Sequence, residues 1–187
     1  MVGPPGAGKG TQAKVLCERI GIPAISTGAI FRKNIAEETE LGLLAQGYIS
    51  EGNLVPDDVT NRLVEARLRE DDAQEGFLLD GYPRNLDQVA ALDAMLEEMG
   101  EKINCVVELT IPDDIIVDRL LGRAALEGRE DDTEEVIRHR INVYHESTQP
   151  LVSVYRERGI LLSVDGVGTI DEVLERLVAQ LRAFLGL

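Results

Sequence analysis

A glycine-rich segment that runs directly into a helix-forming stretch constrains this chain more than any other part of its sequence. Residues 3–11 read Gly-Pro-Pro-Gly-Ala-Gly-Lys-Gly-Thr, and residues 12–16 have helical character. Glycines let consecutive backbone N–H groups face one anion, and the helix adds the positive end of its dipole at the same place. Lys9 supplies a point charge for outer phosphates. A plain Gly/Pro turn beside a helix does not explain the lysine at this spacing, so we predict a phosphate-binding loop.

The hydroxyl residue of this loop stands one position later than usual. Phosphate-binding loops commonly have Ser or Thr directly after the lysine, whereas here Gly10 intervenes and the hydroxyl belongs to Thr11. The resulting Gly-Lys-Gly-Thr sequence resembles the loops of nucleoside-monophosphate kinases more than those of general nucleoside triphosphatases.

Length and composition indicate one globular domain over residues 1–187. The chain is 44% hydrophobic, which is enough to build a core. No apolar run approaches the roughly 20 residues of a membrane helix, and we expect no signal peptide ahead of the loop. Cys17 and Cys105 are too few for a disulfide framework or a zinc site. We expect both to be buried thiols of a cytoplasmic protein.

The chain is strongly acidic. Its net charge of −15 argues against nucleic-acid binding through a broad basic surface. A nucleotide site in such a protein must therefore be locally positive, and the few arginines become the candidate ligands.

Predicted strands and helices alternate along the chain. We expect short strands at 23–26, 77–79, 103–109 and 160–164, and helices at 11–20, 29–38, 41–50, 57–70, 86–99, from 112, 132–158 and from 169. Asp132 with Glu135, and Thr169 with Glu172, look like capping boxes. This alternation predicts an α/β fold in which helices flank a parallel sheet in three layers.

Ligands of such folds bind at the carboxyl ends of the strands. The phosphate loop, Ser26-Thr27, Asp80-Gly81 and Asp165-Gly166 all lie at predicted strand ends, so we expect them to converge. Within Asp80–Arg84, the carboxylate can orient waters on Mg²⁺ and the guanidinium can hold a phosphate in a planar fork. The alternative for this pentapeptide is a Gly-Pro turn with a solvated arginine.

Four arginines flank one segment of this acidic chain. Arg119 and Arg123 are four residues apart and share a helix face. Arg129 follows within a predicted loop at residues 122–131, and Arg140 lies on the next helix. A solvated face with salt bridges is one interpretation, and a short lid over a polyphosphate at residues 122–132 is the one we favour.

Taken together, these motifs resemble the adenylate kinase family in its short-lid form. The resemblance runs in order along nearly the whole chain, through Gly3–Gln12, Ser26–Gly28, Arg32, Asp80–Arg84, Gln88, Asp118-Arg119, Gly122-Arg123, Arg129–Asp132, Arg140 and Val164–Gly166. It implies a fold of the P-loop nucleoside-triphosphate-hydrolase type with an AMP-binding helical insertion at residues 26–55. It also implies a cytoplasmic monomer that uses ATP, AMP and ADP and has no nucleic-acid or membrane partner.

The resemblance implies a role for each matched residue. ATP is held by Gly6, Ala7, Gly8, Lys9, Gly10, Thr11, Arg119, Arg123 and Gly166. AMP is held by Thr27, Arg32, Asn53, Leu54, Val55, Gly81, Tyr82, Pro83, Arg84, Gln88, Arg129 and Arg140, with Thr27 and Gln88 at the adenine-reading positions. The catalytic cations are Lys9, Arg84, Arg123, Arg129 and Arg140. Mg²⁺ binds with ATP through water near Thr11 and Asp80, and zinc is not expected, because the predicted lid has no Cys or His.

The start of the chain departs from the family. Members begin with an apolar strand of about six residues, whereas only Met1-Val2 precede Gly3 here. If that central strand is missing, its neighbours have backbone groups without hydrogen-bond partners. Each such buried group costs about 1–3 kcal/mol, and the total free energy of unfolding of a domain is only about 5–15 kcal/mol. We therefore expect a misplaced or shortened start, or else marginal folding of the chain as printed.

Two alternatives to ATP:AMP phosphotransfer remain open. One is a kinase for another nucleoside monophosphate, UMP, CMP or GMP. The other is a nucleotide-binding module made inactive by loss of the first strand.

Overall fold

The computed structural model describes residues 1–127 and 133–187, without the side chains of residues 123–127. The strands are β1 (Ala24–Ser26), β2 (Leu78–Asp80), β3 (Val106–Thr110) and β4 (Leu161–Asp165). The α-helices are α1 (Lys9–Ile20), α2 (Thr27–Ala36), α3 (Glu40–Ser50), α4 (Asp57–Leu68), α5 (Leu86–Met99), α6 (Asp113–Glu127), α7 (Glu134–Val143), α8 (Pro150–Glu157) and α9 (Ile170–Leu185).

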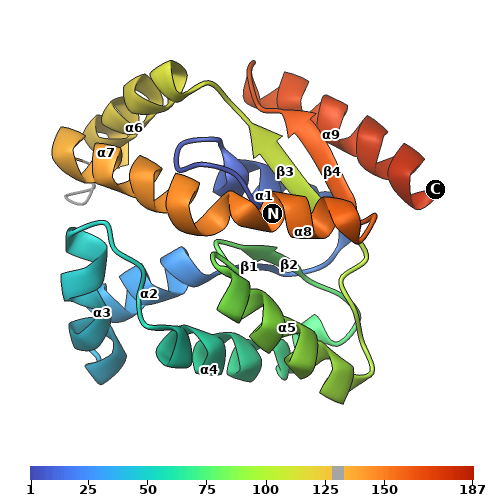
Figure 1. The fold of residues 1–187 in the computed structure, drawn as a ribbon, viewed down its shortest axis with the longest axis horizontal. Coiled ribbons are helices and arrows are strands. Elements are labelled where there is room, and N and C mark those ends of the chain that lie inside the picture. The colour runs from blue at the N-terminus through green and yellow to red at the C-terminus, as the bar shows by residue number, and fades with distance from the viewer. Residues whose placement is uncertain (128–132) are drawn as a thin grey trace.

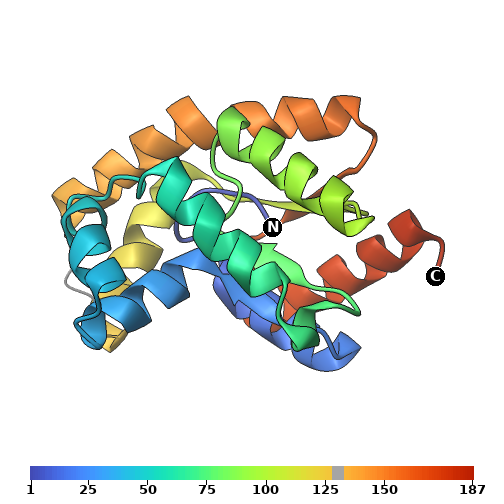
Figure 2. The same cartoon turned by 90° about the horizontal axis from the view of Figure 1, so that it is seen from below.

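The strands lie between two layers of helices, as the alternation predicts. Helices α1 and α9 pack together on one face, and α9 also packs on β4. Helices α5 and α8 cover the other face, so that the strands run between the two pairs (Figure 1, Figure 2). Every strand pair is parallel, which is the expected consequence of the intervening helices.

The strands form two small sheets instead of the single sheet we predicted. β1 pairs with β2, and β3 pairs with β4. Met1 and Val2 lie between the two sheets: the Met1 amine donates to the Leu79 carbonyl at 2.6 Å, and Val2 donates to the Val107 carbonyl at 2.8 Å. Two residues can touch both sheets, but they are too few to form a continuous ladder between them.

A cavity of about 430 Å³ is lined by residues of both sheets. It is lined from one sheet by Leu78 and Leu79 and from the other by Val106 and Val107, with Tyr155 of α8 beside them. Cys105 also lines the cavity and is only half-buried, whereas Cys17 is buried as expected. The predicted marginal folding is not tested by these contacts and stays a prediction.

The predicted helix at 132–158 is interrupted. Tyr144–Thr148 form a π-helical turn between α7 and α8, in which the Gln149 N–H donates to the Tyr144 carbonyl at 2.9 Å. Pro150 has no N–H to continue the α-helical ladder, which accounts for the break at this place. The N-cap of α7 is Thr133 and not Asp132, because the Thr133 hydroxyl accepts the Val136 N–H.

Helix α6 is longer than predicted. It continues through residues 122–127 of the predicted loop, where Ala124-Ala125-Leu126-Glu127 are strong helix formers. Residues 128–132 of the predicted lid lie outside the described part of the chain.

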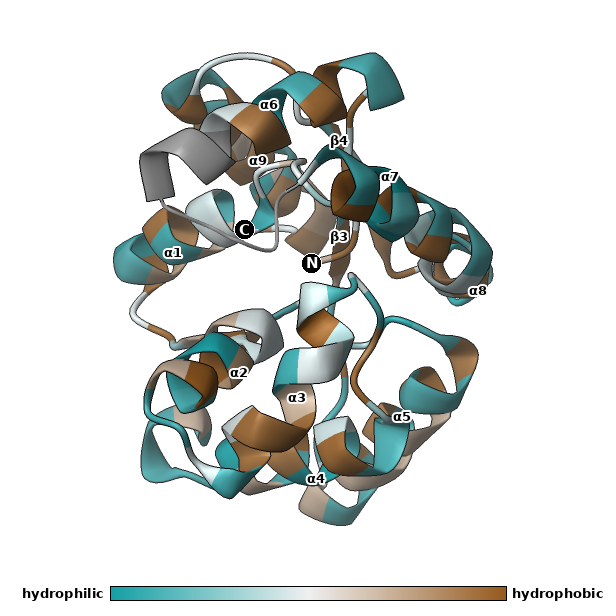
Figure 3. Ribbon diagram, turned by 90° about the vertical axis from the view of Figure 1, so that its left-hand side faces the viewer, coloured by the Kyte–Doolittle hydropathy of each residue, from teal (hydrophilic) through white to brown (hydrophobic). Residues whose placement is uncertain are grey.

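Helices α2, α3 and α4 form one group, which Figure 3 shows below α6 and α7. Phe31, Ala45 and Val55 make its small core. Ser26 and Thr39 cap α2 and α3 by accepting N–H groups of their first turns. Within the described residues, none of the helices combines the length and the apolar character that crossing a membrane requires.

Candidate active site

The phosphate loop joins the centre of the fold to α1. Gly8 is the N-cap of α1 and has φ 89°, in the left-handed region that glycine tolerates. A Cβ on Gly6 would lie 3.0 Å from Leu120 of α6, so the loop packs tightly beneath that helix. The Lys9 ammonium donates to the Gly3 and Pro4 carbonyls at 2.8 and 2.9 Å. These contacts hold the lysine over the loop, which is the position that the predicted role of Lys9 as a phosphate ligand requires.

Asp80 ends β2 beside this loop. Its carboxylate is buried and accepts a hydrogen bond from the Ser26 hydroxyl at 3.2 Å. A Cβ on Gly10 would lie 3.4 Å from Asp80 Oδ2, so the carboxylate faces the first turn of α1. Oxygen ligands of this kind suit Mg²⁺, which keeps several waters and takes few protein ligands. The described residues contain no group of three His, Cys, Asp or Glu that could hold a metal ion.

Most of the predicted AMP residues line one pocket between α2, α3, α4 and the end of β2. Two contacts shape its floor: the Thr27 hydroxyl donates to the Gly81 carbonyl at 2.9 Å, and Arg84 Nε donates to the same carbonyl at 2.7 Å. The pocket is lined by Thr27, Arg32, Asn53, Leu54, Val55, Gly81, Arg84, Gln88 and Arg140, together with Gly28, Phe31, Ile49, Gly52 and Thr60, which we had not assigned to AMP.

An adjoining pocket connects this site to the phosphate loop. Gly52, Leu54, Gly81, Arg84 and Arg140 line both pockets. Lys9 and Pro83 line the second pocket, so Lys9, Arg84 and Arg140 border the same space. Burial lowers the pKa of the Arg84 guanidinium and nearby Asp80 opposes that effect; an arginine stays charged in proteins. Arg129 and the side chain of Arg123 lie outside the described structure.

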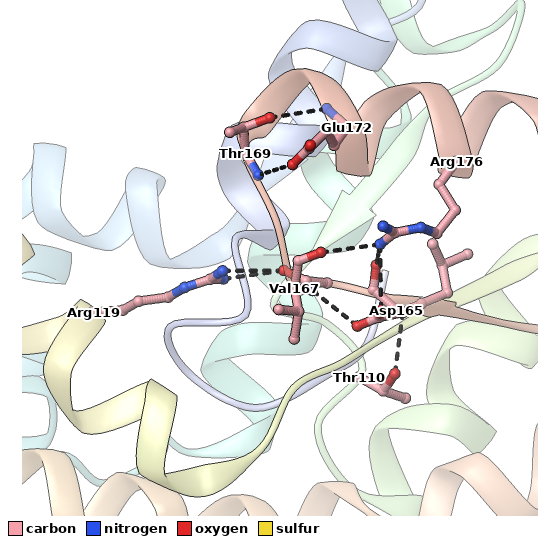
Figure 4. A network of polar contacts seen from close by, with 9 residues as sticks. Thr110, Arg119, Asp165, Val167, Thr169, Glu172 and Arg176 are labelled. Atoms are coloured by element: carbon pink, nitrogen blue, oxygen red, sulfur yellow. Dashed lines mark hydrogen bonds and ion pairs between the residues drawn. The ribbon is translucent and has the colours of Figure 1, made fainter.

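On the other side of the loop, Arg119 meets the turn after β4. Both terminal nitrogens of Arg119 donate to the Gly166 carbonyl at 3.2 Å (Figure 4). The Gly166 N–H donates to the Thr110 carbonyl at 2.8 Å, and a Cβ on Gly166 would lie 3.3 Å from the Ala7 carbonyl. The structure thus brings the predicted ATP residues Gly6, Ala7, Arg119 and Gly166 together around the phosphate loop.

Comparison with known proteins decides the family. The family model described as adenylate kinase matches residues 1–160. The chain is 58% identical to the adenylate kinase of Kocuria rhizophila over 97% of its own length and 96% of the relative's. It is 58% identical to the adenylate kinase of Clavibacter michiganensis subsp. michiganensis, and the match covers 97% of this chain and 90% of the relative. It is 52% identical to the adenylate kinase of Thermobifida fusca, and that match covers 98% of this chain and 97% of the relative. This chain belongs to the adenylate kinase family. It is accordingly a nucleotide-binding enzyme of the kinase class.

Tyr82 is the one described residue of the predicted AMP set that lines neither the pocket between α2, α3 and α4 nor the adjoining pocket. Tyr82 is 1% exposed and donates its hydroxyl hydrogen to Asn61 Oδ1 at 2.7 Å. Its ring lies in the core with Val64 and Leu92. Tyr82 therefore stabilises the turn that carries Arg84, and its side chain does not line the pocket of the predicted AMP residues.

Asp57 is a site residue that sequence reasoning missed. Gln88 Nε2 donates to Asp57 Oδ1 at 2.7 Å, and Asn85 Nδ2 donates to both Asp57 oxygens at 3.0 and 3.1 Å. Gln88 Oε1 accepts the Arg84 N–H at 2.8 Å. Asp57 therefore orients the amide that we predicted to read adenine. It lies 31 residues before Gln88, so no short motif could reveal the pair.

Helix α7 approaches the turn after α3 closely at two further residues, Arg140 and His139. Gly52 has φ 80°, and a Cβ there would lie 2.8 Å from Cγ of Arg140. His139 Nε2 lies 2.7 Å from Asn53 Oδ1. Residues 51–53 fall between the predicted helices 41–50 and 57–70, but their contact with α7 could be found only in the tertiary structure.

Proposed function

We propose that this chain catalyses the reversible transfer of the terminal phosphoryl group from Mg-ATP to AMP, giving two molecules of ADP. The observation that carries the proposal is the shared pocket of Lys9, Arg84 and Arg140, which lies between the phosphate loop and the pocket lined by Thr27, Arg32 and Gln88. Such a reaction would serve adenine nucleotide homeostasis.

ATP lies with its phosphates on the loop from Gly6 to Thr11 in this proposal. The glycine N–H groups and the N-terminus of α1 bind the phosphates, and the first turn of α1 contains no acidic residue that would compete for them. Arg119, Arg123 and the Gly166 backbone hold the far end of ATP. Asp80 and Thr11 would hold Mg²⁺ through water, and the ion would supply charge neutralisation on the phosphates when bound.

AMP occupies the pocket that α2, α3 and α4 form. Its phosphate faces Arg32, Arg84 and Arg140, and its base lies near Thr27 and Gln88, with residues 53–55 and Gly81 along its length. A hydroxyl and an amide discriminate between bases, because a wrong base leaves buried polar groups unpaired. This pair of residues therefore supports AMP over UMP, CMP and GMP.

The chemical step requires positioning and charge, not a dedicated base. An oxygen of the AMP phosphate, already anionic, forms a bond to the γ-phosphorus of ATP. The bond from that phosphorus to the β–γ bridging oxygen breaks, and its electron pair stays on the departing ADP. Lys9, Arg84 and Arg140 neutralise the charge that passes between the two phosphates, together with Arg123 and Arg129 in our proposal.

Further elements of the proposal follow the family pattern. Residues 26–55 form the AMP-binding insertion of one kinase domain over residues 1–187, and the enzyme acts as a monomer. Residues 122–132 act as a short lid that excludes water when it closes; residues 128–132 of this segment lie outside the described structure.

A substrate panel tests the proposal. ADP formation from Mg-ATP is measured with AMP, GMP, CMP or UMP, and a reaction without any monophosphate gives the rate of simple hydrolysis. We expect rapid turnover with AMP and a rate near the hydrolysis background with GMP, CMP and UMP. Equal turnover with all four would contradict the assignment of Thr27 and Gln88, and tight ATP binding without turnover would favour the inactive-module alternative.

A further inference from the structure

The turn at residues 165–169, which joins β4 to α9, is held by two arginines from opposite sides (Figure 4). Arg119 of α6 donates to the Gly166 carbonyl at 3.2 Å. Arg176 of α9 donates through Nη1 to the carbonyl of Asp165 and, at 3.2 Å, to that of Val167. Three consecutive carbonyl groups of the 165–169 turn thus point at cationic donors.

The side chain of Asp165 completes the contact with Arg176. Asp165 Oδ1 accepts the Val167 N–H at 2.9 Å, and Asp165 Oδ2 lies 3.6 Å from Arg176 Nη1. The Arg176 side chain is 33% exposed, so solvent weakens these interactions only in part. Without the Arg176 guanidinium, the Asp165 carboxylate would repel the carbonyl oxygens of Asp165 and Val167. The backbone of the turn would then change its conformation to separate these groups.

Other contacts attach the 165–169 turn to the phosphate loop and its helix. Gly166 packs against the Ala7 carbonyl, as described above. Gln12 of α1 is buried and its Nε2 donates to the Ile170 carbonyl at 2.9 Å. Thr169 and Glu172 form a complete capping box at the start of α9. Only one stretch of the turn, from Asp165 to Val167, depends on Arg176 for its shape.

We infer that Arg176 is a positioning residue for ATP, acting through the shape of the 165–169 turn. The inference rests on the proposed function, in which the γ-phosphate of ATP faces Lys9 and the base therefore extends away from the AMP pocket, toward Arg119 and this turn. Arg176 approaches from the side opposite Arg119 and does not itself touch the nucleotide. Its loss affects ATP binding and leaves the AMP pocket unchanged, because none of the turn residues lines that pocket.

The inference predicts a selective change in KM. Arg176→Met keeps the length of the side chain and removes its donors and charge, and we expect KM for ATP to rise about tenfold. KM for AMP and kcat should stay within about twofold of the wild type. Arg176→Lys retains one charged donor group and should recover part of the ATP affinity. Arg182→Met, which removes an exposed positive charge from the same helix, is the matched control and should leave both KM values unchanged.

A direct measurement of ATP binding shows whether the role of Arg176 is wrong or the proposed function is wrong. Titration of each variant with a non-hydrolysable ATP analogue should reproduce the tenfold loss in Arg176→Met alone. An unchanged ATP affinity in a folded Arg176→Met variant would overturn the role of Arg176, and so would an equal rise in both KM values. Absence of AMP-dependent turnover in the wild type would instead refute the proposed function, while the ATP titration would still report on Arg176.

Discussion

At the scale of single residues, Gln88 shows how the proposed AMP pocket is organised. Its amide already makes two internal hydrogen bonds, from Nε2 to Asp57 and to Oε1 from the Arg84 N–H. An amide has two N–H donors and an oxygen with two lone pairs, so one donor and one acceptor position remain for a ligand. The internal partners fix which edge of the amide faces the pocket.

Asp57→Asn tests this organisation. The new amide keeps one oxygen that can accept from Gln88, but it places an NH₂ group against the Asn85 donor, so we expect the free energy of unfolding to fall by about 1–3 kcal/mol. We also expect KM for AMP to rise, because a neutral amide oxygen holds Gln88 less firmly than the carboxylate does, while KM for ATP stays unchanged. Denaturant unfolding and steady-state kinetics measure both effects.

The neighbouring Asp58 provides the control, since it shares the first turn of α4 but is exposed. Asp58→Asn removes the same charge from the same helix terminus. Equal effects of the two substitutions would show that helix electrostatics, and not the contact with Gln88, explain the result.

At the scale of elements, His145 joins the π-helical turn to the first turn of α6. Its Nδ1 lies 2.7 Å from Gln149 Oε1, and its Nε2 lies 3.1 Å from Asp113 Oδ2. Acceptors at both ring nitrogens favour the protonated ring. The hydrogen bond to Gln149 raises the pKa of His145, and Asp113 contributes in the same direction against the effect of burial.

The sign of this shift gives a pH dependence. Because the pKa of His145 is higher in the folded state, its contribution to stability is complete below the unfolded value of about 6.5 and is lost as pH rises through the folded value. Asp113→Asn should therefore lower Tm more at pH 5 than at pH 8. Asp114→Asn, in the same turn of α6, should change Tm equally at both pH values. A Tm difference between wild type and Asp113→Asn that does not vary with pH would refute the pairing.

The elements differ in how well the sequence could predict them. Helix α5 has the predicted limits, because Asn85 and Gly100 mark its ends locally. The break at Tyr144–Thr148 was not predicted, although Pro150 is a local signal for it. No local pattern, however, shows the contact in which Thr148 donates to the Arg84 carbonyl at 2.7 Å, 64 residues away. The same distinction applies to the site, where the motifs located Lys9 and Arg84, but Asp57 and His139 required tertiary contacts.

At the scale of the whole molecule, charge is distributed unevenly. The chain carries a net charge of −15, yet Arg32, Arg84 and Arg140 line one pocket and Lys9 lines its neighbour. An acidic surface repels nucleotides at long range, and salt screens that repulsion. Binding must therefore depend on cations that different elements bring together: the phosphate loop, the turn after β2, α2 and α7.

The central claim is that these cations act together on the transferred phosphoryl group, and kcat of Arg140→Ala tests it most directly. Arg138→Ala is the control, since Arg138 lies on the same helix and pairs with Glu134 in solvent. We predict that kcat for ADP formation from Mg-ATP and AMP falls about a hundredfold in Arg140→Ala and stays within twofold in Arg138→Ala, both variants keeping the wild-type circular dichroism spectrum. A folded Arg140→Ala variant with wild-type kcat would contradict the account.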